Sequence, residues 1–179
     1  MERSIIIAGF GGQGVILAGK ILAQAGMDYG LEVTWLPSYG PEMRGGTANC
    51  TVVLSDEVVG SPIVDESTAL IAMNLPSLDK FEQTVASSGR IVVNRSLIDR
   101  EVERSDVETS YVDMNAIARD HVGNPRAINM VALGAYIKAS EAIPLQVVKE
   151  TMARAMRGSG KEKFIEMNER ALEAGYEAA

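Results

Sequence analysis

A glycine-rich segment near the start of the chain has residue types and a spacing that suit anion binding. Residues 9–14 read Gly-Phe-Gly-Gly-Gln-Gly, a G-x-G-x-x-G turn that follows an apolar strand at 4–8 and precedes an apolar helix. The first N–H groups of a helix have no partner inside it, and the helix dipole adds positive partial charge there. We therefore expect a phosphate or other anion to meet the backbone donors of Gly11, Gly12, Gln13 and Gly14. Alternatively, the glycines only allow a tight turn and close packing.

Residues 38–46, Ser-Tyr-Gly-Pro-Glu-Met-Arg-Gly-Gly, form a second glycine-rich loop. Its three glycines and proline favour a loop of defined shape. It follows a predicted strand at 31–36 that we expect Pro37 to end, and ligands of open α/β sheets bind where the carboxyl ends of strands meet. Arg44 has a planar guanidinium that can meet a phosphate or carboxylate, although a solvated pair with Glu42 is the alternative. The candidate binding residues here are Glu42, Arg44, Gly45 and Gly46.

The composition excludes several classes of protein. The formal charge is −7, and the chain lacks the clustered Lys and Arg that binding to nucleic acid requires. The single cysteine, Cys50, can form no internal disulfide and hold no iron–sulfur cluster, and with one histidine, His121, we expect no metal site. Because Cys50 lies in a β-rich run, we predict a core residue rather than a nucleophile. Redox chemistry would then need an organic cofactor or another polypeptide.

Chain length and hydropathy point to a simple organisation. A length of 179 residues suits one domain, 1–179. No apolar run approaches the length of a membrane span, and no charged-then-apolar leader opens the chain. We therefore expect a cytoplasmic protein that makes no membrane contact.

The order of the periodic segments predicts a doubly wound α/β fold, with a mostly parallel sheet and a helical C-terminal third. The strand at 4–8, a helix over 15–29 ended by Gly30 and the strand at 31–36 form a βαβ unit. The run 47–55, with extended chain at 58–59 and 63–64, predicts a hairpin or an antiparallel edge. Further strands are expected at 68–73, 90–94 and 110–112, and further helices from the turn at 74–77 to Ala86 and over 116–121, 126–139, 144–156 and 161–176, with a flexible break at 157–160.

The predicted helix at 126–139 differs from the others in composition. The helix is apolar nearly all round, so both of its faces should be buried.

A dinucleotide-binding fold needs an acidic residue at the end of the second strand, to hold a ribose hydroxyl. Residues 35–38 read Trp-Leu-Pro-Ser and supply none. The missing acid weighs against a stand-alone nucleotide-binding Rossmann-like protein, which we keep as the alternative function. A third possibility is a scaffold protein whose glycine turn binds nothing.

Three segments, in this order, resemble the gamma subunit of 2-oxoacid:ferredoxin oxidoreductases: 9–14, 37–46 and the Asn-Met-Val-Ala-Leu-Gly-Ala run at 129–135. The resemblance covers essentially the whole chain. It implies oxidative decarboxylation of a 2-oxoacid with coenzyme A as co-substrate, which yields acyl-CoA and CO₂ and passes electrons to ferredoxin. Similar chains occur in complexes for 2-oxoglutarate, pyruvate and branched-chain 2-oxoacids and in indolepyruvate oxidoreductase. A free-standing gamma chain favours the 2-oxoglutarate type.

The resemblance also implies where the cofactors lie. Thiamine diphosphate with Mg²⁺ and the iron–sulfur clusters would belong to partner subunits, namely alpha, beta and a ferredoxin-like delta subunit. The lone cysteine agrees with this expectation, and no Gly-Asp-Gly…Asn run for Mg²⁺-thiamine diphosphate occurs. The isolated chain would then be inactive, with no catalytic residue and no metal ligand of its own.

Overall fold

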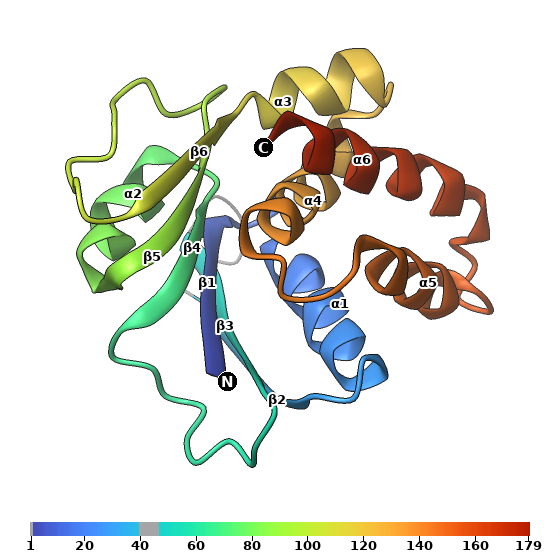
Figure 1. Cartoon of the computed structure of the whole chain (residues 1–179). Helices are drawn as coiled ribbons and strands as arrows, with labels where there is room; N and C mark the ends of the chain where they lie inside the picture. Colours follow the sequence, from blue (N-terminus) through green and yellow to red (C-terminus); the bar gives the residue numbers. More distant parts are fainter. Residues whose placement is uncertain (1, 40–46) are drawn as a thin grey trace.

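The computed structural model describes residues 2–39 and 47–179. Six strands form one sheet in the order β2-β3-β1-β4-β5-β6 (Figure 1). Pairing is parallel between β1 and β4, β4 and β5, and β5 and β6, whereas β3 pairs antiparallel with both β1 and β2. The predicted α/β fold with a mostly parallel sheet is confirmed. The strands are β1 (Glu2–Phe10), β2 (Glu32–Tyr39), β3 (Thr47–Ser55), β4 (Ser67–Ala72), β5 (Val85–Asn94) and β6 (Glu108–Val112).

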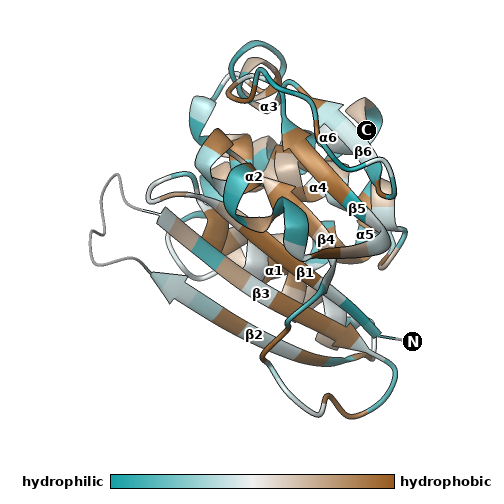
Figure 2. Cartoon of the chain, turned by 90° about the vertical axis from the view of Figure 1, so that its left-hand side faces the viewer, coloured by the Kyte–Doolittle hydropathy of each residue, from teal (hydrophilic) through white to brown (hydrophobic). Residues whose placement is uncertain are grey.

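Helices lie on both faces of the sheet. On one face lie α1 (Val15–Asp28) and α4 (Ile128–Ser140), with α5 (Leu145–Met156) and α6 (Ile165–Ala178) packed outside them, and on the other face lies α2 (Leu75–Phe81) (Figure 1). Hydrophobic residues concentrate in the central strands, which α2 overlies in Figure 2. Two cores result, because successive side chains of a strand point to opposite faces. On β1, Ile5 and Ile7 belong to the large core under the four helices, and Ile6 belongs to the smaller core under α2.

Helix α4 is the central helix of the large core, as its all-round apolar sequence predicts. Nearly all of its residues are buried. Its backbone meets that of α6 directly, because a Cβ at Gly134 would overlap the carbonyl of Leu172 and one at Gly175 would overlap the carbonyl of Val131. Glycine at both positions thus sets how closely the two helices approach. Preceding α4, a short α3 (Met114–Ala116) and a π-helical segment (Ile117–His121) occupy the position of the expected helix over 116–121.

The prediction for residues 47–64 was right about the strand and its antiparallel direction but wrong about its partner. The strand β3 exists, but residues 58–59 and 63–64 form no strand, and their side chains Val58 and Ile63 are 85% and 72% exposed. Instead β3 lies inside the sheet, with Thr47 opposite Phe10 of β1 and Leu54 opposite Val33 of β2. The backbone of β3 is thus paired on both sides, and its side chains Cys50, Val52 and Leu54 lie in the large core, a burial that exposed residues could not provide.

Two predicted boundaries also shift. Pro37 does not end β2, which continues to Tyr39, because β2 is the outer strand and its unpaired side needs no N–H from proline. The helix that was expected to reach Ala86 ends at Phe81, a 3₁₀ turn follows (Glu82–Thr84), and β5 begins at Val85. The break at 157–160 is a turn between α5 and the last helix, with Gly158 and Gly160 at positive φ.

Candidate functional site at the carboxyl edge of the sheet

The first glycine turn lies at the carboxyl end of β1, as predicted. Gly12 (φ 99°) and Gly14 (φ 75°) adopt the left-handed conformation that glycine accepts at no steric cost. Gly14 is the N-cap of α1, and its side-chain-free backbone leaves the first helical N–H groups without a capping side chain. The turn thus joins strand to helix in the geometry that leaves backbone donors at a helix N-terminus.

Gln13 has a structural task inside this turn. Its backbone N–H donates to the carbonyl of Phe10 at 3.1 Å, and its Oε1 accepts from the N–H of Phe10 at 2.6 Å. The same Oε1 accepts from Nδ2 of Asn74 at 3.2 Å, and Nε2 donates to the carbonyl of Met73 at 3.4 Å. Gln13 therefore fixes the turn against the end of β4, and the N–H groups of Gly11, Gly12 and Gly14 remain the candidate donors.

Side-chain amides continue from Gln13 along the carboxyl edge. Asn74 caps α2 through its Oδ1, which accepts from the N–H of Ser77 at 3.0 Å. Asn94, at the end of β5, donates from Nδ2 to the carbonyl of Met73 at 3.1 Å and to Oδ1 of Asn115 at 2.8 Å. Asn94 is fully buried, and its Oδ1 has no hydrogen-bond partner among the residues that the structure describes. Each of these amides reaches a neighbouring strand end, so they hold the edge together.

Asn129 connects the glycine turn to α4. Its Nδ2 donates to the carbonyl of Gly14 at 3.2 Å. A Cβ at Gly14 would lie 2.6 Å from that same Nδ2, so the absence of a side chain at Gly14 is what allows the approach. Sequence reasoning included Asn129 only within the resemblance. The available signal was a polar amide in the first turn of a helix that is otherwise apolar.

The second candidate loop falls largely outside the described residues. Glu42, Arg44, Gly45 and Gly46 belong to the segment 40–46, and their predicted place beside the first turn stays a prediction. The residues that flank the segment are described. Tyr39 pairs with Ala48, and Thr47 pairs with Phe10, the second residue of the glycine turn. The chain on both sides of 40–46 thus lies at the carboxyl edge, next to the turn or one strand away.

Cys50 is a core residue, as predicted. It is fully buried on β3, and its Sγ donates to the carbonyl of Val15 at 3.6 Å. Burial raises the pKa of the thiol to about 12, so it stays protonated at neutral pH. It can therefore neither act as a nucleophile nor hold an iron–sulfur cluster. In the described part of the chain, no group of His, Cys, Asp and Glu side chains is placed to hold a metal ion, and no helix is long and apolar enough to cross a membrane.

The strand order bears on nucleotide binding. In a dinucleotide-binding fold, the second strand lies next to the first and its end supplies the ribose-binding acid. Here β3 lies between β1 and β2, so the end of β2 is one strand removed from the glycine turn. The missing acid at residues 35–38 and this displacement both disfavour a dinucleotide site.

Comparison with known proteins establishes the family. The family model described as pyruvate ferredoxin/flavodoxin oxidoreductase matches residues 4–178. The 2-oxoglutarate synthase subunit KorC of Methanocaldococcus jannaschii is 33% identical, and the alignment covers 100% of this chain and 95% of that one. The chain therefore belongs to the pyruvate ferredoxin/flavodoxin oxidoreductase family, and the expected resemblance is confirmed.

Two kinds of relative differ in length. The ketoisovalerate oxidoreductase subunit VorA of Methanothermobacter thermautotrophicus is 44% identical, but this chain spans only 36% of it. Among solved structures, the keto/oxoacid ferredoxin oxidoreductase gamma subunit of Geobacter sulfurreducens superposes with a TM-score of 0.85 at 29% identity, over 99% of this chain and 98% of that one. The 2-oxoglutarate:ferredoxin oxidoreductase of Magnetococcus marinus, solved with 2-oxoglutarate, coenzyme A and succinyl-CoA bound, gives a TM-score of 0.87 at 25% identity over 31% of its chain. The same fold thus occurs as a separate chain and as part of longer ones.

Proposed function

We propose that this chain is the gamma-type component of a 2-oxoacid:ferredoxin oxidoreductase. The assembled enzyme would cleave the bond between the carboxylate and the carbonyl carbon of a 2-oxoacid and release CO₂. The acyl group would pass to the thiol of coenzyme A, and the electrons freed by the oxidation to ferredoxin. The observation that carries the proposal is the match in fold to the keto/oxoacid ferredoxin oxidoreductase gamma subunit, with a TM-score of 0.85 over 99% of the chain.

We assign the reaction centres to partner subunits. Thiamine diphosphate with Mg²⁺ supplies the carbanion chemistry of such reactions, and iron–sulfur clusters carry the electrons. The described residues do not fit these groups, because Cys50 is buried with its pKa raised and no acidic cluster could hold Mg²⁺. Alpha, beta and ferredoxin-like delta subunits in the cytoplasm would provide them, and no step of the chemistry runs through this chain.

The contribution of this chain would be the carboxyl edge of its sheet. The N–H groups of Gly11, Gly12 and Gly14 would meet an anionic group of a ligand or a partner subunit, in a turn that Gln13 and Asn129 hold in place. Arg44 and Glu42, with Gly45 and Gly46, would complete the same surface. Arg44 would supply a positive charge beside the neutral amides of Gln13 and Asn74.

Purification from the native host tests the assembly. The chain, tagged and isolated without oxygen, should bring with it a thiamine-diphosphate protein and a cysteine-rich cluster protein. The complex should reduce ferredoxin only when a 2-oxoacid and coenzyme A are both present. Assays with 2-oxoglutarate and with 2-oxoisovalerate decide the substrate class, since one relative is a 2-oxoglutarate subunit and another a ketoisovalerate subunit. A chain that is recovered alone or as a homo-oligomer would contradict the proposal.

Arg44→Ala in the assembled enzyme tests the second loop. Loss of a charge-assisted contact should lower turnover or assembly by about tenfold. Arg157→Ala, an exposed arginine beyond α5, is the matched control and should change neither. If Arg44→Ala leaves both activity and complex mass unchanged, Arg44 is not part of the site.

A further inference from the structure

One loop at the amino edge of the sheet, opposite the glycine turn, exposes two aliphatic side chains to solvent. Residues 56–66 connect the end of β3 to the start of β4 and extend below the sheet in Figures 1 and 2. Val58 is 85% exposed and Ile63 is 72% exposed, the highest values among the large hydrophobic residues that the structure describes. Apolar side chains exposed to this extent on one loop mark a surface that another molecule covers.

Hydrogen bonds give the loop a defined shape. The Oγ of Ser55 accepts from the N–H of Glu57 at 3.1 Å. The Oγ of Ser61 accepts from the N–H of Ile63 at 3.1 Å and donates to the carbonyl of the same residue at 3.4 Å. Pro62 fixes the backbone φ between them. Because this shape exists before a partner arrives, binding to the loop loses less conformational entropy.

The loop carries negative charge and no positive charge. Asp56 and Glu57 lie at its start, Asp65 and Glu66 lie at its end, and no Lys or Arg lies between them. The side chains of Glu57 and Asp65 are exposed and have no hydrogen-bond or ion-pair partner among the described residues. Glu66 differs, since its charge interacts with that of Arg104. A surface that covers this loop must therefore supply positive charge.

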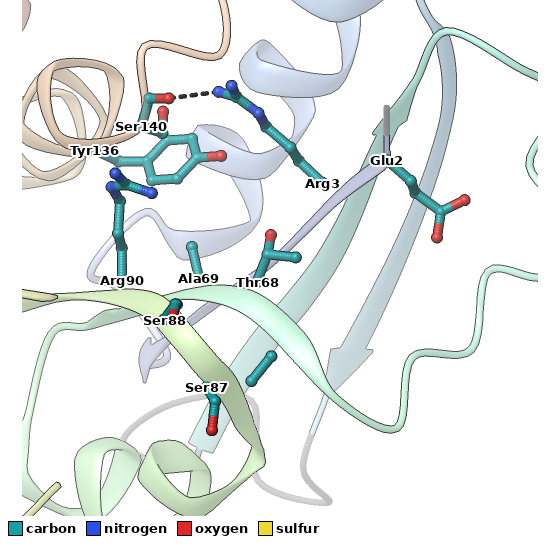
Figure 3. Close-up of a pocket in the computed structure, with 11 residues that line it drawn as sticks. Glu2, Arg3, Thr68, Ala69, Ser87, Ser88, Arg90, Tyr136 and Ser140 are labelled. Carbon is teal, nitrogen blue, oxygen red and sulfur yellow. Dashed lines mark hydrogen bonds between the residues drawn. The ribbon is translucent and has the colours of Figure 1, made fainter. Parts of the chain in front are cut away.

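A cavity of about 400 Å³ lies between the loop and the start of β1. Glu2 lines it from β1, and Ile63 and Asp65 line it from the loop. Figure 3 shows the carboxylate of Glu2 directed away from the guanidinium groups of Arg3 and Arg90. Two carboxylates beside an aliphatic wall suit a lysine or arginine side chain, which has an apolar stem and a charged end.

We propose that the loop 56–66 is a docking element for a partner subunit of the oxidoreductase, whose surface offers an apolar recess with lysine or arginine at its rim. Val58 and Ile63 would enter the recess, and a basic side chain would lie between Glu2 and Asp65. The inference rests on the function proposed above, which requires partner subunits. A second copy of this chain suits the loop less well, because each copy has a formal charge of −7 and the two would repel.

Hydrogen exchange of the backbone amides tests where the partner lies. The isolated chain is compared with the complex that is purified from the native host without oxygen. The amides of residues 57–66 should exchange about tenfold more slowly in the complex, or slower still, because the partner excludes water from the loop. Equal exchange of these amides in the isolated chain and in the complex would overturn the inference.

Competition between variant and parent chains measures what the two aliphatic side chains contribute. Both chains are expressed together in the native host, the complex is separated from free chain by size, and mass spectrometry gives their ratio in the complex. Val58→Ser and Ile63→Ser should each lower the share of the variant about tenfold, and the double variant about a hundredfold. Leu97→Ser, at a side chain 45% exposed in another turn, is the matched control and should compete equally with the parent.

Two further measurements separate docking from folding and test the charge. Because Val58 and Ile63 are exposed, their variants should unfold at the same urea concentration as the parent chain. Asp65→Lys should lower the share of the variant about tenfold, since it opposes the basic rim. Glu177→Lys reverses an exposed charge at the end of α6, far from the loop in Figures 1 and 2, and should change nothing.

The outcomes distinguish this inference from the proposed function. A double variant that joins the complex as well as the parent does would overturn the inference and leave the proposed function intact. A parent chain that is recovered alone would contradict both. If the double substitution instead converts a dimer of the isolated chain into a monomer, the loop binds a second copy, and its assignment to a partner subunit is wrong.

Discussion

The two ends of helix α4 meet two polar regions of opposite character. At its N-terminal end, Asn129 contacts the glycine turn, where the described polar side chains are neutral amides that bond to one another and to strand ends. At its C-terminal end, about 20 Å away, Ser140 contacts Arg3 in a cavity at the amino edge that two guanidinium groups line, those of Arg3 and Arg90 (Figure 3). The first region is defined by backbone shape, since a Cβ would distort it, and the second by side-chain charge. Substitutions that change shape should therefore damage the first edge, and substitutions that change charge the second.

Disrupting the packing of α6 against α4, the helix that joins the two edges, should have the largest effect on stability. Gly175→Ala places a methyl group against the backbone of α4 at Val131, so α6 must move away. We expect a loss of about 3 kcal/mol of unfolding free energy or more, measured by urea denaturation. Gly60→Ala is the control, because nothing lies within 4 Å of its added Cβ, and it should stay within about 0.5 kcal/mol. Equal stability of the two variants would show that α4 and α6 do not pack backbone to backbone.

Substitutions at two glycines of the turn allow the cost of steric contact to be measured separately from the cost of backbone strain. Gly12→Ala adds a Cβ at positive φ in open space and should cost about 1 kcal/mol. Gly14→Ala adds the same strain and a contact at 2.6 Å with Asn129, so about 2–3 kcal/mol is expected. In an Asn129→Ala background, which removes the amide but keeps the Asn129 Cβ at 2.9 Å, the cost of Gly14→Ala should fall only in part. Additive costs in this double-mutant cycle would remove Asn129 from the support of the turn.

Alkaline pH should distinguish the two buried acids of the large core. The pKa of Cys50 is about 12 in the folded chain against an ordinary value of 9.0, and that of Tyr136 is about 12 against 10.0. The unfolded chain therefore binds fewer protons above pH 9, and stability should fall as pH rises from 9 toward 12. The decline between pH 9 and 10 belongs to Cys50 and should reach about 1 kcal/mol.

Single variants check that assignment. Cys50→Ala should remove most of the decline between pH 9 and 10, and Tyr136→Phe mainly the additional decline above pH 10. Unfolding free energies measured at several pH values for the three proteins give the comparison. A parent chain whose stability is constant up to pH 11 would mean that neither side chain is buried in its neutral form.

Much of the carboxyl edge could be predicted from the sequence because its signals are local. The strand, the glycines and the apolar helix at 4–28 follow one another directly, and each fixes the conformation of its neighbours. The apolar run at 126–139 likewise predicts a helix buried on both sides, because an apolar face exposed to water would be unfavourable. The family model matches residues 4–178, which include both of these segments.

Only the tertiary structure decided which segments are neighbours. The alternation within β3 indicates a strand but does not say that it pairs antiparallel between β1 and β2. The amides of Gln13, Asn74 and Asn94 are far apart in the chain, and no spacing rule connects them. Arg3 and Arg90 are brought to one cavity by the register of three strands and the end of one helix. Hydrophobic periodicity reports the burial and the period of a segment, whereas pairing, polar networks and cavities depend on contacts between distant residues, which only the folded chain creates.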